Sequence, residues 1–164
     1  MAQDWLLPDE LRVLRAYTRS GRALFAQFDR ELQRDAGLPR AYLEILWLLD
    51  HAPGRSLRMN ELADAAASHA SRITYAVARL EEDGLVRRDL CARDRRGWFA
   101  VLTEEGSAAL RRAAPCYVKR IREHLLAPLS PEDREHLARI GETLLAHLAE
   151  ARERGEPLAT AGQP

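Results

Sequence analysis

The sequence predicts a mainly α-helical fold with a small β-hairpin, of the α+β class. Apolar residues recur at the spacing of an α-helix through most of the chain. Between residues 85 and 103 this period gives way to two short runs typical of β-strands. With 164 residues, of which 46% are hydrophobic and 30% charged, the chain is long enough to bury a core of its own.

The charge balance and the hydropathy exclude several classes of protein. The chain has 25 Lys and Arg against 25 Asp and Glu, which excludes a polycation that coats nucleic acid but not a local basic patch. No apolar run is long enough to span a membrane, and the first residues lack the pattern of a secretion signal. Two cysteines, Cys91 and Cys116, are too few for a disulfide framework. We expect a cytoplasmic protein with no membrane partner.

The first half of the chain is expected to begin with two helices separated by Gly and Pro. The first is predicted over residues 8–36, and the Gly-Leu-Pro sequence at 37–39 ends it. The second is apolar on nearly all sides over residues 42–49, so we expect it to be buried at the centre of the fold. The apolar stripe of the first helix consists of Leu11, Leu14, Leu24, Phe25, Phe28 and Leu32.

Two short helices and a hairpin are predicted next. The helices cover residues 61–66 and about 71–83, after a short polar link, and Gly84 is placed to end the second one. The strands cover residues 85–90 and 98–103, and they enclose a long charged tip. Because two short strands alone are marginally stable, the hairpin is expected to pack on the neighbouring helices.

The C-terminal part is predicted to form two further helices. Thr103 can cap the first of them, and Pro115 predicts a kink or break within it. The second helix starts at Ser130 and Pro131, and we expect it to bury Leu137, Ile140, Leu144, Leu145 and Leu148. The expected organisation is an N-terminal helix (8–36), a central lobe (39–104), C-terminal helices (105–154) and a disordered tail (155–164).

The order of two short helices and a basic hairpin predicts a winged helix-turn-helix. With Ile73, Val77 and Leu80 facing the core, the opposite face of the second helix carries Arg72, Tyr75 and Arg79 at i, i+3 and i+7. Such a ridge fits the major groove of double-stranded DNA, where Arg can read guanine and hydroxyls can reach phosphates or bases. The candidate DNA contacts of this helix are Ser68, His69, Ser71, Arg72, Thr74, Tyr75 and Arg79.

The hairpin supplies a second candidate contact. Residues 85–97 hold five Arg against two Asp, a local charge of +3. Arg side chains on a narrow tip suit the minor groove, which singles out Arg93, Arg95 and Arg96. Asp94 is expected to pair with a neighbouring Arg and to support the shape of this wing.

Several motifs together resemble the MarR family of transcriptional regulators: ELA (61–63), SRITYAVARLEEDGLVRR (71–88), DRR (94–96) and LTEEG (102–106). The resemblance extends over roughly residues 8–150. It implies a homodimer with intertwined terminal helices, which places two lobes on adjacent major grooves of a pseudo-palindrome. It also implies that the helix with Arg72 is the recognition helix, and that Asp94 and Arg96 form the wing motif. The turn at residues 66–68 lacks the usual Gly, so we expect it to be shaped differently.

The resemblance further implies a small aromatic or phenolic effector held between the dimer helices and the DNA-binding lobe. The candidate pocket residues are Phe25, Phe28, Tyr42, Trp47 and His51, although side chains in such positions more often belong simply to the core. The His51 side chain could bind such a ligand or a backbone carbonyl. Redox control is an alternative, because Arg93 beside Cys91 could lower the pKa of that thiol, whereas Cys116 is expected to be inert. No cofactor is expected, and no His or Cys pair has metal-ligand spacing.

The sequence therefore predicts a ligand-responsive DNA-binding regulator of the repressor type without enzymatic activity. A winged-helix module that binds proteins and not DNA is the alternative, and zero net charge leaves it open. An enzyme is disfavoured, because the sequence has no Gly-rich phosphate loop, no catalytic Ser/His/Asp order and no paired carboxylates with an evident cleft.

Overall fold

The computed structural model describes residues 5–90 and 97–154. Its residues form two compact units, one up to Ile121 and one from Arg122 onward. The elements of the first unit are α1 (Pro8–Ala36), α2 (Arg40–His51), the 3₁₀ turn η1 (Pro53–Arg55), β1 (Ser56–Arg58), α3 (Met59–Ala65), α4 (Ala70–Glu82), β2 (Val86–Leu90), β3 (Trp98–Leu102) and α5 (Glu104–Ile121). The second unit has a π-helical turn (Arg122–Leu126) and α6 (Pro131–Glu153).

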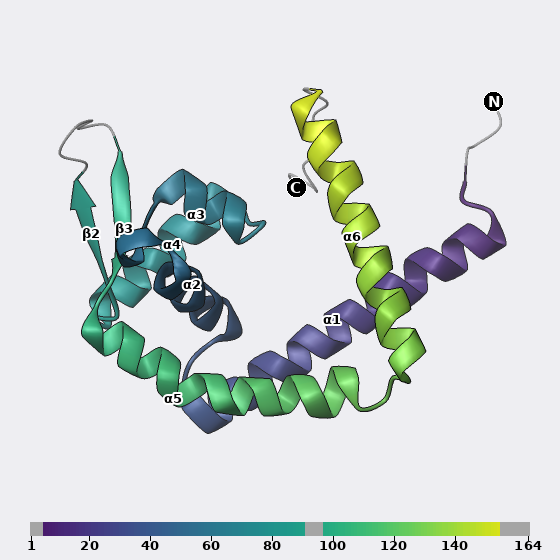
Figure 1. Ribbon diagram of the computed structural model, residues 1–164, viewed down its shortest axis with the longest axis horizontal. Helices are drawn as coiled ribbons and strands as arrows, with labels where there is room; N and C mark the ends of the chain where they lie inside the picture. The colour runs from purple at the N-terminus through teal and green to yellow at the C-terminus, as the bar shows by residue number, and fades with distance from the viewer. Residues whose placement is uncertain (1–4, 91–96, 155–164) are drawn as a thin grey trace. The chain divides into compact units, whose positions relative to one another are not determined.

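The predicted fold class is confirmed, with one strand more than expected. The sheet has three antiparallel strands in the order β1-β3-β2, and Figure 1 shows the β2–β3 hairpin beside α3 and α4. The short strand β1 lies in the segment interpreted as a polar link, and it pairs Arg58 with Phe99 on β3. On the other edge, β2 pairs Val86 with Leu102 and Leu90 with Trp98. Three residues are too few to show a strand period, so the sequence alone does not reveal β1.

The core of the first unit lies between α2, α4 and the sheet. Leu46 and Leu49 of α2 are fully buried, as are Val77 and Leu80 of α4. The expectation that α2 is buried at the centre of the fold is confirmed for the face with Leu46 and Leu49, whereas Trp47 remains 51% exposed. Burial follows one face of α2, since the helix packs against the lobe on that face and leaves the opposite face open.

Two helix ends in the lobe have the same Schellman geometry but different residues. At the end of α4, Leu85 N–H donates to Leu80 C=O (2.8 Å) and Gly84 has a φ of 72°. At the end of α3, Ser68 N–H donates to Ala63 C=O (3.0 Å) and Ala67 has a φ of 45°. The expectation that this turn is shaped differently without Gly was therefore wrong, because Ala67 adopts the left-handed backbone conformation. This conformation is strained for a residue with a Cβ.

The start of α5 is joined closely to the turn before β2. The hydroxyl of Thr103 donates to Gly84 C=O (2.8 Å) and accepts from Gly106 N–H (2.9 Å), so the predicted cap is confirmed. A Cβ on Gly106 would lie 2.0 Å from the backbone oxygen of Leu85. The close approach of α5 to this turn therefore requires Gly at position 106.

Helix α5 does not break at Pro115, which lies inside it. Figure 1 shows its axis changing direction part way along, as expected where a proline removes one helical hydrogen bond and crowds the preceding turn. Helix α1 packs along α5 within the first unit.

The start of α6 is as predicted, whereas the burial of α6 is not. The hydroxyl of Ser130 accepts from Asp133 N–H (3.1 Å), which caps the helix. The apolar residues expected to be buried are 43–67% exposed in the single chain, namely Leu137, Ile140, Leu144, Leu145 and Leu148. Leu14 and Phe25 of α1 are similarly exposed. Helical periodicity identified these apolar faces correctly, but it does not tell what covers them. No helix in the described ranges is long and apolar enough to cross a membrane.

Candidate nucleic-acid interface

Helix α4 separates a buried face from an exposed ridge as the sequence predicts. Ile73 is 4% exposed and Val77 and Leu80 are fully buried, which fixes the rotation of the helix about its axis. Arg72 and Arg79 consequently lie on the exposed face, and Tyr75 is 68% exposed. The structure thus places the three predicted residues together on one surface.

The N-terminal end of α4 is open to solvent. His69 is the N-cap residue, and its side chain makes no capping hydrogen bond. It is exposed like Ser71, whereas Ser68 is half-buried. The hydroxyl of Thr74 donates to Ala70 C=O at 2.8 Å, so it is engaged within its own helix. The first N–H groups of a helix can hold a phosphate oxygen, and this end of α4 is accessible to one.

The two arginines of the ridge differ in their pairing. Nη1 of Arg79 lies 2.5 Å from Oε2 of Glu82, and both side chains are more than half exposed. Arg72 makes no ion pair within residues 5–90 and 97–154. Arg72 can therefore bind an anion at once, whereas Arg79 must first exchange its contact with Glu82.

The two strands of the hairpin, β2 and β3, form the stem of the wing. An ion pair holds this stem to α4. Nε of Arg88 lies 2.6 Å from Oε2 of Glu81, and Arg88 N–H donates to Oε1 of the same carboxylate (3.1 Å). The Arg88 guanidinium holds the pKa of the Glu81 carboxyl below its usual range. On β2, Arg87 likewise binds Asp89 (2.8 Å) and lowers the pKa of that carboxyl. The predicted tip residues Arg93, Asp94, Arg95 and Arg96 lie outside the described residues.

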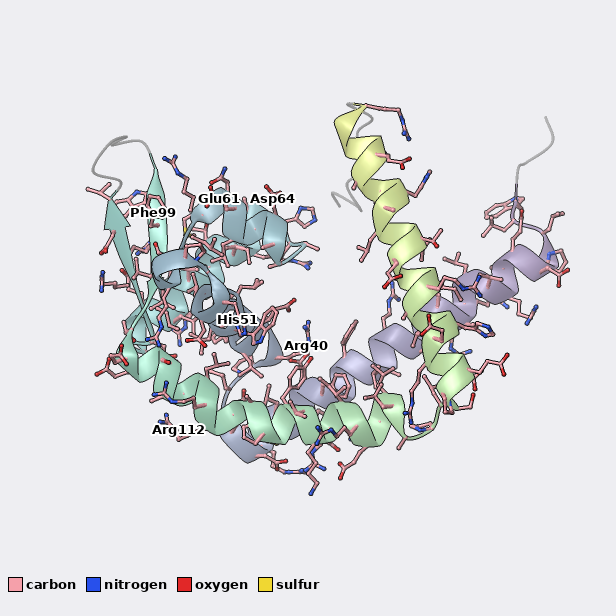
Figure 2. All side chains as sticks on the ribbon, in the orientation of Figure 1. Arg40, His51, Glu61, Asp64, Phe99 and Arg112 are labelled. Carbon is pink, nitrogen blue, oxygen red and sulfur yellow. The ribbon has the colours of Figure 1, made fainter. Side chains whose placement is uncertain are left out.

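Arg58 is a basic residue of the wing that the sequence analysis did not single out. Its guanidinium lies 5.3 Å from the ring centre of Phe99, which Figure 2 shows on β3 near the wing tip. A Cβ on Gly97 would lie 3.4 Å from Arg58 Nη1. Arg58 reaches this position because β1 pairs with β3. The spacing of residues in the sequence does not reveal that pairing.

The five candidate residues of an effector pocket do not share one environment. Phe28 is in the core, 2% exposed, and packs edge-on against Tyr117 at 5.5 Å. Trp47 and His51 are exposed on α2 with ring centres 4.4 Å apart. His51 Nδ1 is hydrogen-bonded to Trp47 C=O at 2.9 Å, which is the backbone alternative for this side chain.

The other two candidates lie on different helices, Tyr42 on α2 and Phe25 on α1. Tyr42 is half-buried on α2. The guanidinium of Arg40 lies 4.8 Å from the ring centre of Phe25, so this ring has a cationic neighbour.

Cys116 is a half-buried free thiol on α5. Burial, together with a hydrogen bond to Asp35, raises the pKa of the Cys116 thiol, which disfavours the reactive thiolate. Cys91 lies outside the described residues. In the described part of the chain, no group of three or more His, Cys, Asp and Glu side chains could hold a metal ion.

Comparison with known proteins adds family evidence to this geometry. A model of the MarR family matches residues 36–97. Transcriptional regulator HosA of Escherichia coli is 32% identical over 115 residues, which are 70% of this chain and 83% of HosA.

Solved structures agree with that match over most of the chain. Sco3205 of Streptomyces coelicolor, a MarR family transcriptional regulator solved in complex with DNA, is 44% identical with a TM-score of 0.82 over 88% of this chain and 94% of its own. AbsC of the same organism, also a MarR family transcriptional regulator, is 36% identical with a TM-score of 0.81 over 90% of this chain and 99% of its own. These relatives are transcriptional regulators, not enzymes. The winged lobe, the exposed ridge of α4 and these similarities establish that the chain belongs to the MarR family of transcriptional regulators.

Proposed function

We propose that this regulator binds double-stranded DNA in a sequence-specific manner, with α4 in the major groove. The observation that carries the proposal is the exposed ridge of Arg72, Tyr75 and Arg79 opposite the buried face of α4. A guanidinium can donate two hydrogen bonds to guanine. The relative Sco3205 has been solved with DNA, which supports the same class of partner here.

The wing is proposed to enter the neighbouring minor groove. Arg93, Arg95 and Arg96 would follow the narrow groove with their side chains, and Asp94 would hold the tip in shape. The Glu81–Arg88 ion pair supports this arrangement, because it ties the stem of the wing to α4. Docking of the recognition helix then orients the wing as well.

The binding species is proposed to be a homodimer. The apolar faces of α1 and α6 are exposed in the single chain, including Val13 (63%), Tyr17 (65%) and Leu145 (67%). Faces of this kind are normally covered by another protein surface, and we assign that role to residues 8–36 and 105–154 of a second copy. A two-fold dimer presents two α4 ridges and so fits a pseudo-palindromic operator.

Repression, release by a small aromatic ligand and a cytoplasmic location complete the proposal. A dimer bound across an operator would exclude other proteins from that stretch of DNA. The rings of Trp47 and His51, with centres 4.4 Å apart on the exposed side of α2, offer an aromatic surface for the ligand. Titration of the DNA complex with salicylate as a phenolic probe tests this part: release by wild type, weakened in Trp47→Ala, is expected. No release by salicylate or related phenols would count against it.

Selection of bound sequences from a random duplex pool tests the function itself. We expect an inverted repeat to be recovered, with half-sites about one helical turn apart. Recovery of no consensus by wild type would contradict sequence-specific binding and would favour the protein-interaction module. Light scattering on the same sample checks the dimer, and a stable monomer at micromolar concentration would contradict the paired half-sites.

A further inference from the structure

We propose that Leu90 and Trp98 form an apolar platform on the stem of the wing that packs against the deoxyribose edges of DNA. This inference rests on the proposed function. It adds an apolar contact to the charged contacts that the arginines are proposed to make. The platform would supply affinity that does not depend on salt, because no counterion is released when apolar surfaces meet.

The strand register places the two side chains together. Leu90 of β2 lies directly opposite Trp98 of β3, so both project from the same face of the sheet. Towards the base of the hairpin the same face carries Val86, Ala100 and Leu102, all buried in the core. Near the tip the core ends, and Leu90 is 55% and Trp98 48% exposed. The platform is therefore an uncovered extension of a core face.

The opposite face of the hairpin is covered differently. There the ring of Phe99 is half-buried, with the Arg58 guanidinium 5.3 Å from its centre. Among the described residues of the hairpin, the two large exposed apolar side chains, Leu90 and Trp98, thus lie on one face. Aromatic residues are enriched where proteins bind partners, and here a tryptophan and a leucine lie side by side on an exposed hairpin face.

Position and charge favour DNA as the partner of this surface. Trp98 lies 6.0 Å from the guanidinium of Arg88, which is bound to Glu81 of α4, so the platform is coupled to the proposed recognition helix. The platform leads directly into residues 91–96, where three Arg stand against one Asp. A polyanion with apolar sugar edges between its phosphates matches this combination of a basic tip and an apolar stem.

The charges of the stem itself are already compensated. Arg87 is paired with Asp89 and Arg88 with Glu81. The exposed charges of the stem are therefore already paired within the protein, whereas Leu90 and Trp98 are exposed apolar side chains without a partner surface. This pairing assigns the salt-dependent part of binding to Arg72 and the tip, and the salt-independent part to the platform.

The test compares platform and ridge variants on one duplex recovered from the random pool. Affinity is measured by fluorescence anisotropy at several salt concentrations. We expect Trp98→Ala to weaken binding roughly tenfold, with the slope of log Kd against log salt unchanged. Leu90→Ala should act in the same direction, and Trp98→Phe should restore most of the affinity. Arg72→Ala should reduce the slope as well as the affinity.

Two controls separate a contact from a folding defect. Trp5→Ala removes another exposed tryptophan, 77% exposed and outside the wing, and should leave DNA affinity unchanged. In a Trp5→Phe/Trp47→Phe variant, Trp98 is the sole tryptophan, and its emission should shift or be quenched when the duplex binds. Thermal unfolding checks that Trp98→Ala remains folded.

The inference is overturned if Trp98→Ala binds the duplex as wild type does. It is also overturned if the loss of affinity in Trp98→Ala disappears as the salt concentration is raised. In the Trp5→Phe/Trp47→Phe variant, Trp98 fluorescence that is the same with and without saturating duplex would overturn it as well. In each of these cases wild-type binding persists and the proposed function stands. If wild type binds no duplex, the proposed function fails and this inference fails with it.

Discussion

Arg88 of β2 holds the Glu81 carboxylate of α4 in two ways, through its guanidinium Nε (2.6 Å) and through its backbone N–H (3.1 Å). One carboxylate therefore joins the two elements that we propose to enter adjacent grooves of DNA. Because the carboxylate holds the backbone in the middle of β2 as well as the Arg88 side chain, the pair constrains the direction of the wing relative to α4.

Glu81→Gln is expected to weaken DNA binding several-fold, because the neutral amide holds the wing less firmly. The effect on the free energy of unfolding should be small, about 1 kcal/mol or less, since the pair is partly exposed. Glu82→Gln is the matched control. It frees Arg79 on the ridge and should leave affinity equal or raise it. If Glu81→Gln and Glu82→Gln lose DNA affinity equally on the same duplex, a specific role for Glu81 is contradicted.

Ala67→Gly is expected to stabilise the protein by about 1 kcal/mol, because Gly relieves the left-handed backbone at this residue. Gly84→Ala occupies the equivalent place at the end of α4 and should destabilise by a similar amount. Denaturant unfolding measures both. If Ala67→Gly destabilises, the proposed strain in the turn between α3 and α4 is wrong.

Gly106→Ala is expected to destabilise strongly, by about 3 kcal/mol, because its Cβ would collide with the backbone oxygen of Leu85. The Leu102 side chain is also close, but the nearest atom belongs to the Leu85 backbone, which cannot turn aside as a flexible side chain can. Gly21→Ala is the control, since a Cβ there meets nothing within 4 Å. Thermal melts that place both variants near wild type would show that α5 can shift, contrary to the close approach described above.

Acid is expected to weaken the attachment of α1 to α5. Hydrogen bonds from Arg34 and Arg120 hold the pKa of Asp35 well below its usual range, and Arg120 of α5 lies 2.7 Å from this carboxylate. A lowered pKa means that the contribution is present above the unfolded value, near 3.8, and is lost as pH falls through the folded value. The stability difference between wild type and Asp35→Asn, followed by denaturant unfolding, should shrink below about pH 4. A difference that is constant down to pH 2 would contradict this linkage.

Periodicity and turn residues were sufficient to predict most of the lobe. The inward residues Ile73 and Val77 follow from their spacing, and the ridge of α4 follows from them, since a helix with one buried face must expose the other. The caps at Thr103 and Ser130 were equally readable, because a hydroxyl before an acidic first turn has a local physical role.

Features that depend on distant partners could not be predicted from spacing. The ion pair of Glu81 with Arg88 and the contact of Arg58 with Phe99 arise from strand pairing and helix packing. The exposure of Trp47 and Leu145 depends on which surfaces meet, and an apolar period alone does not specify that. The backbone conformation of Ala67 could not be predicted from its residue type either, because surrounding hydrogen bonds impose a conformation that alanine disfavours.

The affinity of wild type and Arg72→Ala for a duplex recovered from the random pool, followed as salt is raised from about 50 to 200 mM, tests the role of α4 most directly. We predict that wild-type affinity falls steeply and linearly on a log–log plot, and that Arg72→Ala binds more weakly and discriminates less against unrelated duplexes. Wild-type affinity that is insensitive to salt, or an Arg72→Ala variant that binds and discriminates as wild type does, would contradict the account.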